Sequence, residues 1–459
     1  MMDDGRRQML IVSSAAMSLF LISFDINMVN IALPTITTHF NLDVATSAWL
    51  VILFGVVLCG LLLPFGKAGD VLGHRRLFIL GMAIFAVGNF ASGLSYHLDD
   101  FLALVVLRGI SATGAAMMVS VNFAIVSLNL PEDVRGKGLG YFSIFGALGF
   151  MLGPLVSGLL IDLFQWNWIF YLSGSIGILG LIMSVAFIPE SGGRGKAADI
   201  PQTIAMFLLL LFGILALNRY LVDGVTDVVI ISTTIALLSA FLAYARQSKA
   251  ENPLMEPAII KRRDIMLPLL SMALIYMCYS GSMVLLPFYL EYAKGLSPAA
   301  IGMLFLLPAF FVILLGPISG GFADRRGSYS ITLAATAVMV VAMLVFVAMG
   351  RLEGIILTSG GLILMGVSHG LFNAPNNRRV FCNVPMPHIG TASGMHQMIR
   401  QVGSLIGAAT MPAVYQMFAG TEPSLSMMLS GFEWGFALGL VFALLAMVLS
   451  ISMRNACRG

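Results

Sequence analysis

The segment GKAGDVLGHRR, residues 66–76, joins two long apolar stretches and carries glycines and charges at a defined spacing. A second segment, GGFADRRG at 320–327, repeats its glycine and its aspartate 254 residues later. The matched positions are Gly66 with Gly320 and Asp70 with Asp324. Glycines allow two helices to pack closely around a tight turn, and an aspartate at a helix N-terminus can bind nearby arginines. We therefore predict two half-repeats, each with this loop between its second and third helices.

The composition around these loops is typical of a membrane protein. The chain has 459 residues, of which 59% are hydrophobic and 10% are charged, and its mean hydropathy is +0.95. A soluble domain carries roughly 25% charged residues. Fourteen segments reach the length of about 20 apolar residues that a spanning helix needs. These segments are 10–35, 46–65, 77–95, 101–127, 137–162, 167–188, 200–217, 226–246, 266–292, 298–322, 329–350, 355–381, 388–418 and 430–453.

The fourteen segments divide as six, two and six. We expect an all-α integral membrane protein with two pseudo-symmetric six-helix bundles, at 1–195 and 251–459, and a two-helix insert at 196–250. The first apolar run is too long for a signal peptide and contains an acid, so it is predicted to be the first span.

The basic residues predict the orientation. With the N-terminus inside, 20 of the 25 lysines and arginines fall in inside segments and three fall in outside loops. This asymmetry predicts that both termini are cytoplasmic in a multi-pass protein of the plasma (inner) membrane.

Several classes of function are disfavoured by the sequence. It has no basic stripe for nucleic acid, no cysteine pair at CxxC spacing, no Walker A motif, and no HExxH or GxSxG segment. We therefore expect no nucleic-acid partner, no metal site, no cofactor and no enzyme activity.

The 66–76 loop resembles the signature loop of the major facilitator superfamily. Val71 and His74 stand where that family has basic residues. The resemblance implies a fold of two six-helix halves and a charge network that latches the cytoplasmic side. The latch positions are Gly66, Asp70, Gly73, Arg75, Arg76, Gly320, Asp324 and Arg325. The alternative is a solvated basic loop that only sets topology.

The fifth span resembles the antiporter motif of drug:proton exchangers in the same superfamily. The matching positions are Gly140, Gly149, Gly153, Pro154 and Gly158. Ser157 replaces the usual glycine. In that family the motif is associated with export; the alternative is an ordinary packing helix whose GxxxG ridge allows close contact.

The first span contains FDINMVNIALP, residues 24–34, which resembles the fourteen-span drug:proton antiporters of the EmrB/QacA type. Asp25 lies deep in this span, where a carboxylate is costly unless it is protonated or paired. We predict that Asp25 couples transport to protons and that Arg108, at a comparable depth in the fourth span, is its partner. The alternative is a static buried ion pair.

Polar, aromatic and methionine side chains in the spans are candidates for the substrate cavity. They are Asn27, Asn30, Phe145, Met151, Tyr276, Tyr279, His369, Asn373 and Arg400. For each of them, packing between helices or against lipid is the alternative. His369 and His396 could also titrate in the cycle.

These features together predict a monomeric, proton-coupled secondary exporter that works by alternating access. Its partners would be protons, the lipid bilayer and a hydrophobic or amphipathic small molecule, a class that includes cations. Two alternatives remain: a dedicated exporter of one metabolite or lipid, and a transport-inactive receptor or assembly partner on a carrier scaffold.

Overall fold

The protein is represented by a computed structural model that describes residues 4–190, 200–247, 262–349, 354–382, 384, 389–420 and 423–453. Every regular element in these ranges is helical. Fourteen helical segments are long and apolar enough, by length and composition, to cross a membrane. The prediction of an all-α chain with fourteen spans is therefore confirmed.

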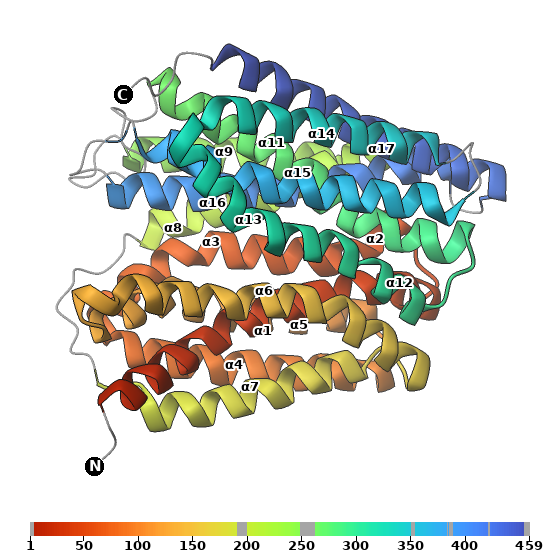
Figure 1. Ribbon diagram of the computed structural model, residues 1–459. Helices are drawn as coiled ribbons and strands as arrows, with labels where there is room; N and C mark the ends of the chain where they lie inside the picture. Colours follow the sequence, from red (N-terminus) through yellow and green to blue (C-terminus); the bar gives the residue numbers. More distant parts are fainter. Residues whose placement is uncertain are drawn as a thin grey trace. The chain divides into compact units, whose positions relative to one another are not determined.

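The helices group into two compact units, drawn from red to yellow-green and from green to blue in Figure 1. Unit 1 consists of Met1–Leu42, Trp49–Leu211 and Ser297–Gly302. Its spanning helices are α1 (Asp4–His39), α3 (Trp49–Leu72), α4 (His74–Leu94), α5 (Phe101–Asn129), α6 (Glu132–Leu163) and α7 (Trp168–Phe187). A short 3-10 helix, η1 (Ser95–His97), follows α4.

Unit 2 consists of Asp43–Ala48, Phe212–Leu296 and Met303–Gly459. Its long helices are α9 (Asp227–Gln247), α11 (Arg263–Phe288), α13 (Leu306–Arg326), α14 (Ser328–Ala348), α15 (Ile355–Phe381), α16 (Ile389–Ala419) and α17 (Leu425–Ser452). Its short elements are α2 (Val44–Ser47) and the π-helical turn η2 (Tyr289–Ala293). Two helices begin in unit 1 and end in unit 2: α8 (Ile200–Asp223) and α12 (Pro298–Leu304).

The same helix pairings occur inside both units. In unit 1, α1 packs on α6 and α7, α4 packs on α5 and α7, and α3 packs on α5. In unit 2, α11 packs on α16 and α17, α14 packs on α15 and α17, and α13 packs on α15. In each set the first helix contacts the fifth and sixth, the third contacts the fourth and sixth, and the second contacts the fourth. The helix packing therefore repeats in the two halves, as the repeated loop predicts.

The repeated loop also has one backbone feature in common. Gly73 precedes α4 with φ +92°, and Gly327 precedes α14 with φ +84°. These two glycines are also 254 residues apart. Positive φ is costly for residues with a Cβ atom, so the tight turn between the second and third helices requires glycine in both halves.

The predicted two-helix insert consists of α8 and α9. The first half of α8 contacts unit 1, because a Cβ atom on Gly60 of α3 would lie 2.7 Å from the Phe207 side chain. The second half contacts unit 2, where the buried Asn218 side chain donates a hydrogen bond to the Ala409 carbonyl at 3.0 Å. The three-part domain division stays a prediction.

We expect the Asn218→Leu variant to lower the free energy of unfolding by about 0.5–2 kcal/mol, the usual worth of a hydrogen bond between spanning helices. The reason is that the substitution removes a buried hydrogen bond between α8 and α16, while the leucine side chain still fills the space of the asparagine. Thermal unfolding of the purified protein measures the effect. The neighbouring half-exposed Leu217, changed to alanine, serves as the control; an equal loss in both variants would contradict the assignment.

Candidate functional site

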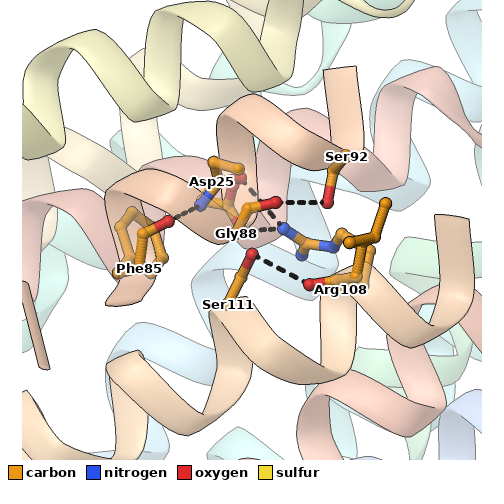
Figure 2. Close-up of polar contacts among 8 residues, drawn as sticks. Asp25, Phe85, Gly88, Ser92, Arg108 and Ser111 are labelled. Carbon is orange, nitrogen blue, oxygen red and sulfur yellow. Dashed lines mark hydrogen bonds and ion pairs between the residues drawn. The ribbon is translucent and has the colours of Figure 1, made fainter. Parts of the chain in front are cut away.

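A buried ion pair lies inside unit 1, between α1 and α5 (Figure 2). The Arg108 Nη1 atom lies 2.8 Å from the Asp25 Oδ2 atom, and each side chain is only 1% exposed. Both charges lie within apolar spanning helices, where an isolated ion would be very costly. The two residues therefore neutralise each other inside the bundle.

Arg108 has further stabilising contacts besides the carboxylate. Its Nη1 atom donates to the Asn89 Oδ1 atom at 3.4 Å, and Asn89 itself donates to the Phe85 carbonyl at 3.0 Å. The guanidinium also lies 4.4 Å from the ring centre of Phe54 and 5.4 Å from that of Phe170. Cation–π contacts of this kind stabilise a cation more strongly when water is excluded.

Asp25 has fewer stabilising contacts than Arg108 has. Among the described residues, neither of its carboxylate oxygens accepts a hydrogen bond of good geometry, so the charge contact with Arg108 is its only polar contact. Buried ion pairs that serve stability usually have additional hydrogen bonds on the remaining lone pairs. Among the described residues, Asp25 therefore depends on a single charge contact, whereas Arg108 also has Asn89 and two aromatic rings.

The antiporter motif on α6 lies directly against the turn of α1 that carries Asp25. A Cβ atom on Gly149 would lie 2.3 Å from the Phe20 carbonyl oxygen, and one on Gly153 would lie 2.7 Å from the Phe24 carbonyl oxygen. One turn further along α6, the Ser157 hydroxyl donates to the Met28 carbonyl at 2.7 Å. Ser157, which stands where the family usually has glycine, thus adds a hydrogen bond between α6 and α1. The three contacted residues of α1, Phe20, Phe24 and Met28, are four residues apart and lie on one face of the helix.

The far end of the same motif contacts the beginning of α12. A Cβ atom on Gly158 would lie 2.2 Å from the Pro298 carbonyl oxygen, and one on Gly302 would lie 2.4 Å from the Pro154 carbonyl oxygen. The Ala299 N–H donates to the Asp162 carboxylate at 3.2 Å. In contrast, a Cβ atom on Gly140 would meet no atom of the described residues within 4 Å.

The predicted latch loop makes contacts within unit 1. Arg75 donates to the Glu190 carboxylate at 2.7 Å and to the Val185 carbonyl at 2.8 Å, which ties the loop to the end of α7. Asp70 lies 3.3 Å from the His74 ring nitrogen, and Arg76 lies 3.9 Å from Glu190. Gly66 has open space beside it. In the second copy, Gly320 lies beside Ala374, and the side chains of Asp324 and Arg325 lie outside the described residues. The latch role stays a prediction.

We expect Arg75→Ala to destabilise the protein more than Glu190→Gln does. Glu190 is 68% exposed, so its pairing with Arg75 is worth less than about 1 kcal/mol. Arg75 also binds the Val185 carbonyl, which Glu190→Gln leaves in place. Thermal unfolding of the two single variants tests the ranking, and a loss in Glu190→Gln that equals or exceeds the loss in Arg75→Ala would contradict it. The double variant adds the coupling energy of the pair, which should stay below about 1 kcal/mol.

A second group of polar and aromatic side chains lies in unit 2, where α11, α15 and α16 pack together. The His369 ring stacks on Tyr279 at 4.2 Å and meets Tyr276 edge-on at 4.9 Å. Tyr276 donates to the Asn373 Oδ1 atom at 3.1 Å, and the Arg400 guanidinium lies 5.5 Å from the Tyr276 ring centre. Five of the predicted cavity residues are therefore neighbours in the structure.

The other predicted cavity residues lie in unit 1. Asn27 is buried and donates to the Ser23 carbonyl of its own helix at 2.7 Å, and Asn30 is buried on the same helix. Phe145 packs against Tyr141 and the hydrophobic core, and Met151 is half-buried on α6. In unit 2, the His396 ring contacts the Asn377 Oδ1 atom at 2.7 Å. These positions keep both the cavity and the packing interpretation open.

Three residues of these networks were not singled out by the sequence: Asn89, Glu190 and Arg379. Asn89 is fully buried in the third span, and its polarity there was the only available signal. Arg379 lies at the end of the predicted span 355–381; it is fully buried, donates to the Met453 carbonyl and lies 5.7 Å from the Tyr329 ring centre. It therefore joins α15 to the end of α17.

The sequence profile of the Major Facilitator Superfamily matches residues 15–408. This range covers most of the chain, and the protein belongs to this superfamily. It is a multi-pass membrane transporter and not an enzyme, and the predicted resemblance is confirmed.

The names of several relatives refer to transport, resistance or export. The chain is 27% identical to the riboflavin transporter RibZ of Clostridioides difficile, over 88% of this chain and 87% of that protein. It is 26% identical to the multidrug resistance protein Stp of Mycobacterium tuberculosis, over 92% and 79%. It is also 26% identical to the tetracenomycin C resistance and export protein of Streptomyces glaucescens, over 87% and 74%.

Solved structures show the same fold at low sequence identity. A peptide transporter POT in complex with sulfate has a TM-score of 0.72 at 16% identity and covers both chains completely. A bacterial homologue of the human lysosomal transporter Spinster, in an inward-facing and unoccupied conformation, has a TM-score of 0.70 at 14% identity and covers 98% of each chain. These similarities support the fold alone.

Proposed function

We propose that this transporter is a proton-coupled exporter of hydrophobic or amphipathic small molecules. Asp25 would carry the proton, and Arg108 would favour its charged form when the proton leaves. Export would proceed by alternating access, in which substrate and proton reach their sites from one side of the membrane at a time.

The observation that carries this proposal is that the two charged side chains of the pair have different numbers of stabilising contacts. Asp25 depends on one contact, whereas Arg108 has the carboxylate, Asn89 and two aromatic rings. Protonation of the acid would remove the counter-charge of Arg108, and the contacts with Asn89 and the two aromatic rings would offset part of that loss.

The relatives support export and leave the substrate range open. Stp and the tetracenomycin C protein are named for resistance or export, whereas RibZ is named for a single vitamin. A dedicated exporter of one metabolite therefore remains the second candidate. Membership of the superfamily as a transporter leaves the receptor alternative without support.

The basic residues support a cytoplasmic location for both termini, and the bacterial transporter relatives support a plasma-membrane location. In that orientation, protons entering the cell would drive compounds outward. The latch around Arg75 would then lie on the cytoplasmic side.

Proteoliposomes containing the full chain test the proposal. An imposed proton gradient should drive accumulation of one or more of ethidium, rhodamine 123, fluorescein and riboflavin, and a protonophore should abolish it. Transport of riboflavin alone would favour the dedicated exporter. Accumulation that is unaffected by the protonophore would contradict proton coupling.

A further inference from the structure

Arg400 is a membrane-embedded cation in unit 2. It lies on α16, eight residues after the start of the span Ala392–Ala419, or about 12 Å along the helix. Its side chain is half-buried, and its Nε atom is buried without a hydrogen-bond partner among the described residues. A guanidinium at this depth is costly unless something compensates its charge.

Arg108 and Arg400 are compensated differently. Arg108 in unit 1 has Asp25 at 2.8 Å. Within the part of the chain that the structure describes, no carboxylate forms an ion pair with Arg400, and its guanidinium lies 5.5 Å from the centre of the Tyr276 ring. The positive charge in unit 2 is therefore available to a ligand.

A second unpaired polar group lies beside it. His369 is 7% exposed, and its Nδ1 atom has no hydrogen-bond partner among the described residues. The imidazole is held by the rings of Tyr276 and Tyr279, and Tyr276 is itself held by Asn373. The group thus combines a flat aromatic surface, a fixed imidazole and an uncompensated guanidinium.

We infer that the cluster of Tyr276, His369, Asn373 and Arg400 binds the substrate and selects planar aromatic compounds that carry a negative charge. The oxyanion of the ligand, such as a carboxylate or a phenolate, pairs with the guanidinium fork of Arg400. The ligand ring packs along Tyr276, which already offers its face to Arg400. This inference rests on the proposed function and narrows its substrate class.

Two dyes with the same xanthene ring and opposite charge test the inference: fluorescein, which is an anion at neutral pH, and rhodamine 123, a cation. Fluorescence anisotropy measures their binding to the purified full-length chain in detergent. We expect fluorescein to bind at least about tenfold more tightly, the usual worth of one charge-assisted hydrogen-bonded contact. Arg400→Gln should remove this preference, and Arg400→Lys should restore part of it.

Arg219→Gln is the matched control. Arg219 is a partly exposed arginine of unit 2 that pairs with Asp223 at 3.4 Å, and its loss should leave the preference for fluorescein unchanged. Equal or tighter binding of rhodamine 123 to the native chain, no binding of either dye, or an unchanged preference in Arg400→Gln would overturn the inference.

If Arg400→Gln fails to fold, a displacement assay on the native chain still tests the charge preference. Naphthalene-2-carboxylate should displace fluorescein more effectively than naphthalene-2-carboxamide does, and equal displacement would overturn the inference. No proton gradient is present in these assays, so a failed charge preference and a failed proton coupling are separate results.

Discussion

Proton-driven export should fall at least about 100-fold in the Asp25→Asn variant, because asparagine keeps the shape of the carboxyl group but cannot carry a proton. The general loss expected from removing an acid that transfers a proton is about 10²–10⁴-fold. Substrate exchange without a gradient should continue, because the substitution leaves the cluster around Tyr276 in unit 2 unchanged. Proteoliposomes measure both activities, the first with an imposed proton gradient and the second with equal pH on the two sides.

Asp223→Asn is the control for this acid-to-amide change. Asp223 is an exposed acid at the end of α8, and its loss should leave gradient-driven export unchanged.

Arg108→Ala should also lose coupling, and it should lower the free energy of unfolding by about 3–5 kcal/mol because a buried carboxylate is left without a partner. Retention of full gradient-driven export in both Asp25→Asn and Arg108→Ala would contradict the role of this pair.

Gly149→Ala should destabilise the protein by about 1–3 kcal/mol or more and should lower export even where the protein folds. The added Cβ atom would lie 2.3 Å from the main-chain oxygen of Phe20, and a main-chain atom cannot move aside as a flexible side chain can. The result would be displacement of α1, which carries Asp25 five residues further on. Thermal unfolding and gradient-driven export measure the two effects.

Gly140→Ala provides the comparison within the same motif. Its Cβ atom would meet nothing within 4 Å, and alanine is favoured over glycine in a helix by about 0.5–1 kcal/mol. We therefore expect unchanged or slightly higher stability and normal export. Similar losses in Gly140→Ala and Gly149→Ala would show that the α1 contact is not what the motif requires.

The fold was largely predictable from the sequence. Apolar runs of spanning length predicted fourteen helices, and the paired loops at 66–76 and 320–327 predicted the repeat. Both signals are local: a span needs a continuous run of apolar residues, and a tight turn needs glycine at a positive φ. The number of spanning helices follows from the first requirement and the repeated glycine turn from the second, whereas the pairing of the helices depends on packing between them.

The site was only partly predictable. Asp25 and Arg108 stand out because charges are rare inside spans, and so does Arg400. Asn89, Glu190 and the contact of Ser157 with Met28 did not stand out, because their roles depend on which helix faces which and on rotation about each helix axis. Those properties come from packing between segments far apart in the chain. The roles of the site residues remain proposals.

The repeated helix pairings have a consequence for the history of the chain. A six-helix ancestor whose gene was duplicated would have begun with identical charges in its two copies. The copies now differ: in the first, an acid on the first helix pairs with an arginine on the fourth, whereas in the second the arginine inside the span lies on the fifth helix and no acid pairs with it among the described residues. After duplication, selection could change one half without disabling the other. Proton handling and ligand recognition could then evolve separately, and variation among relatives in ligand preference should concentrate in the second half.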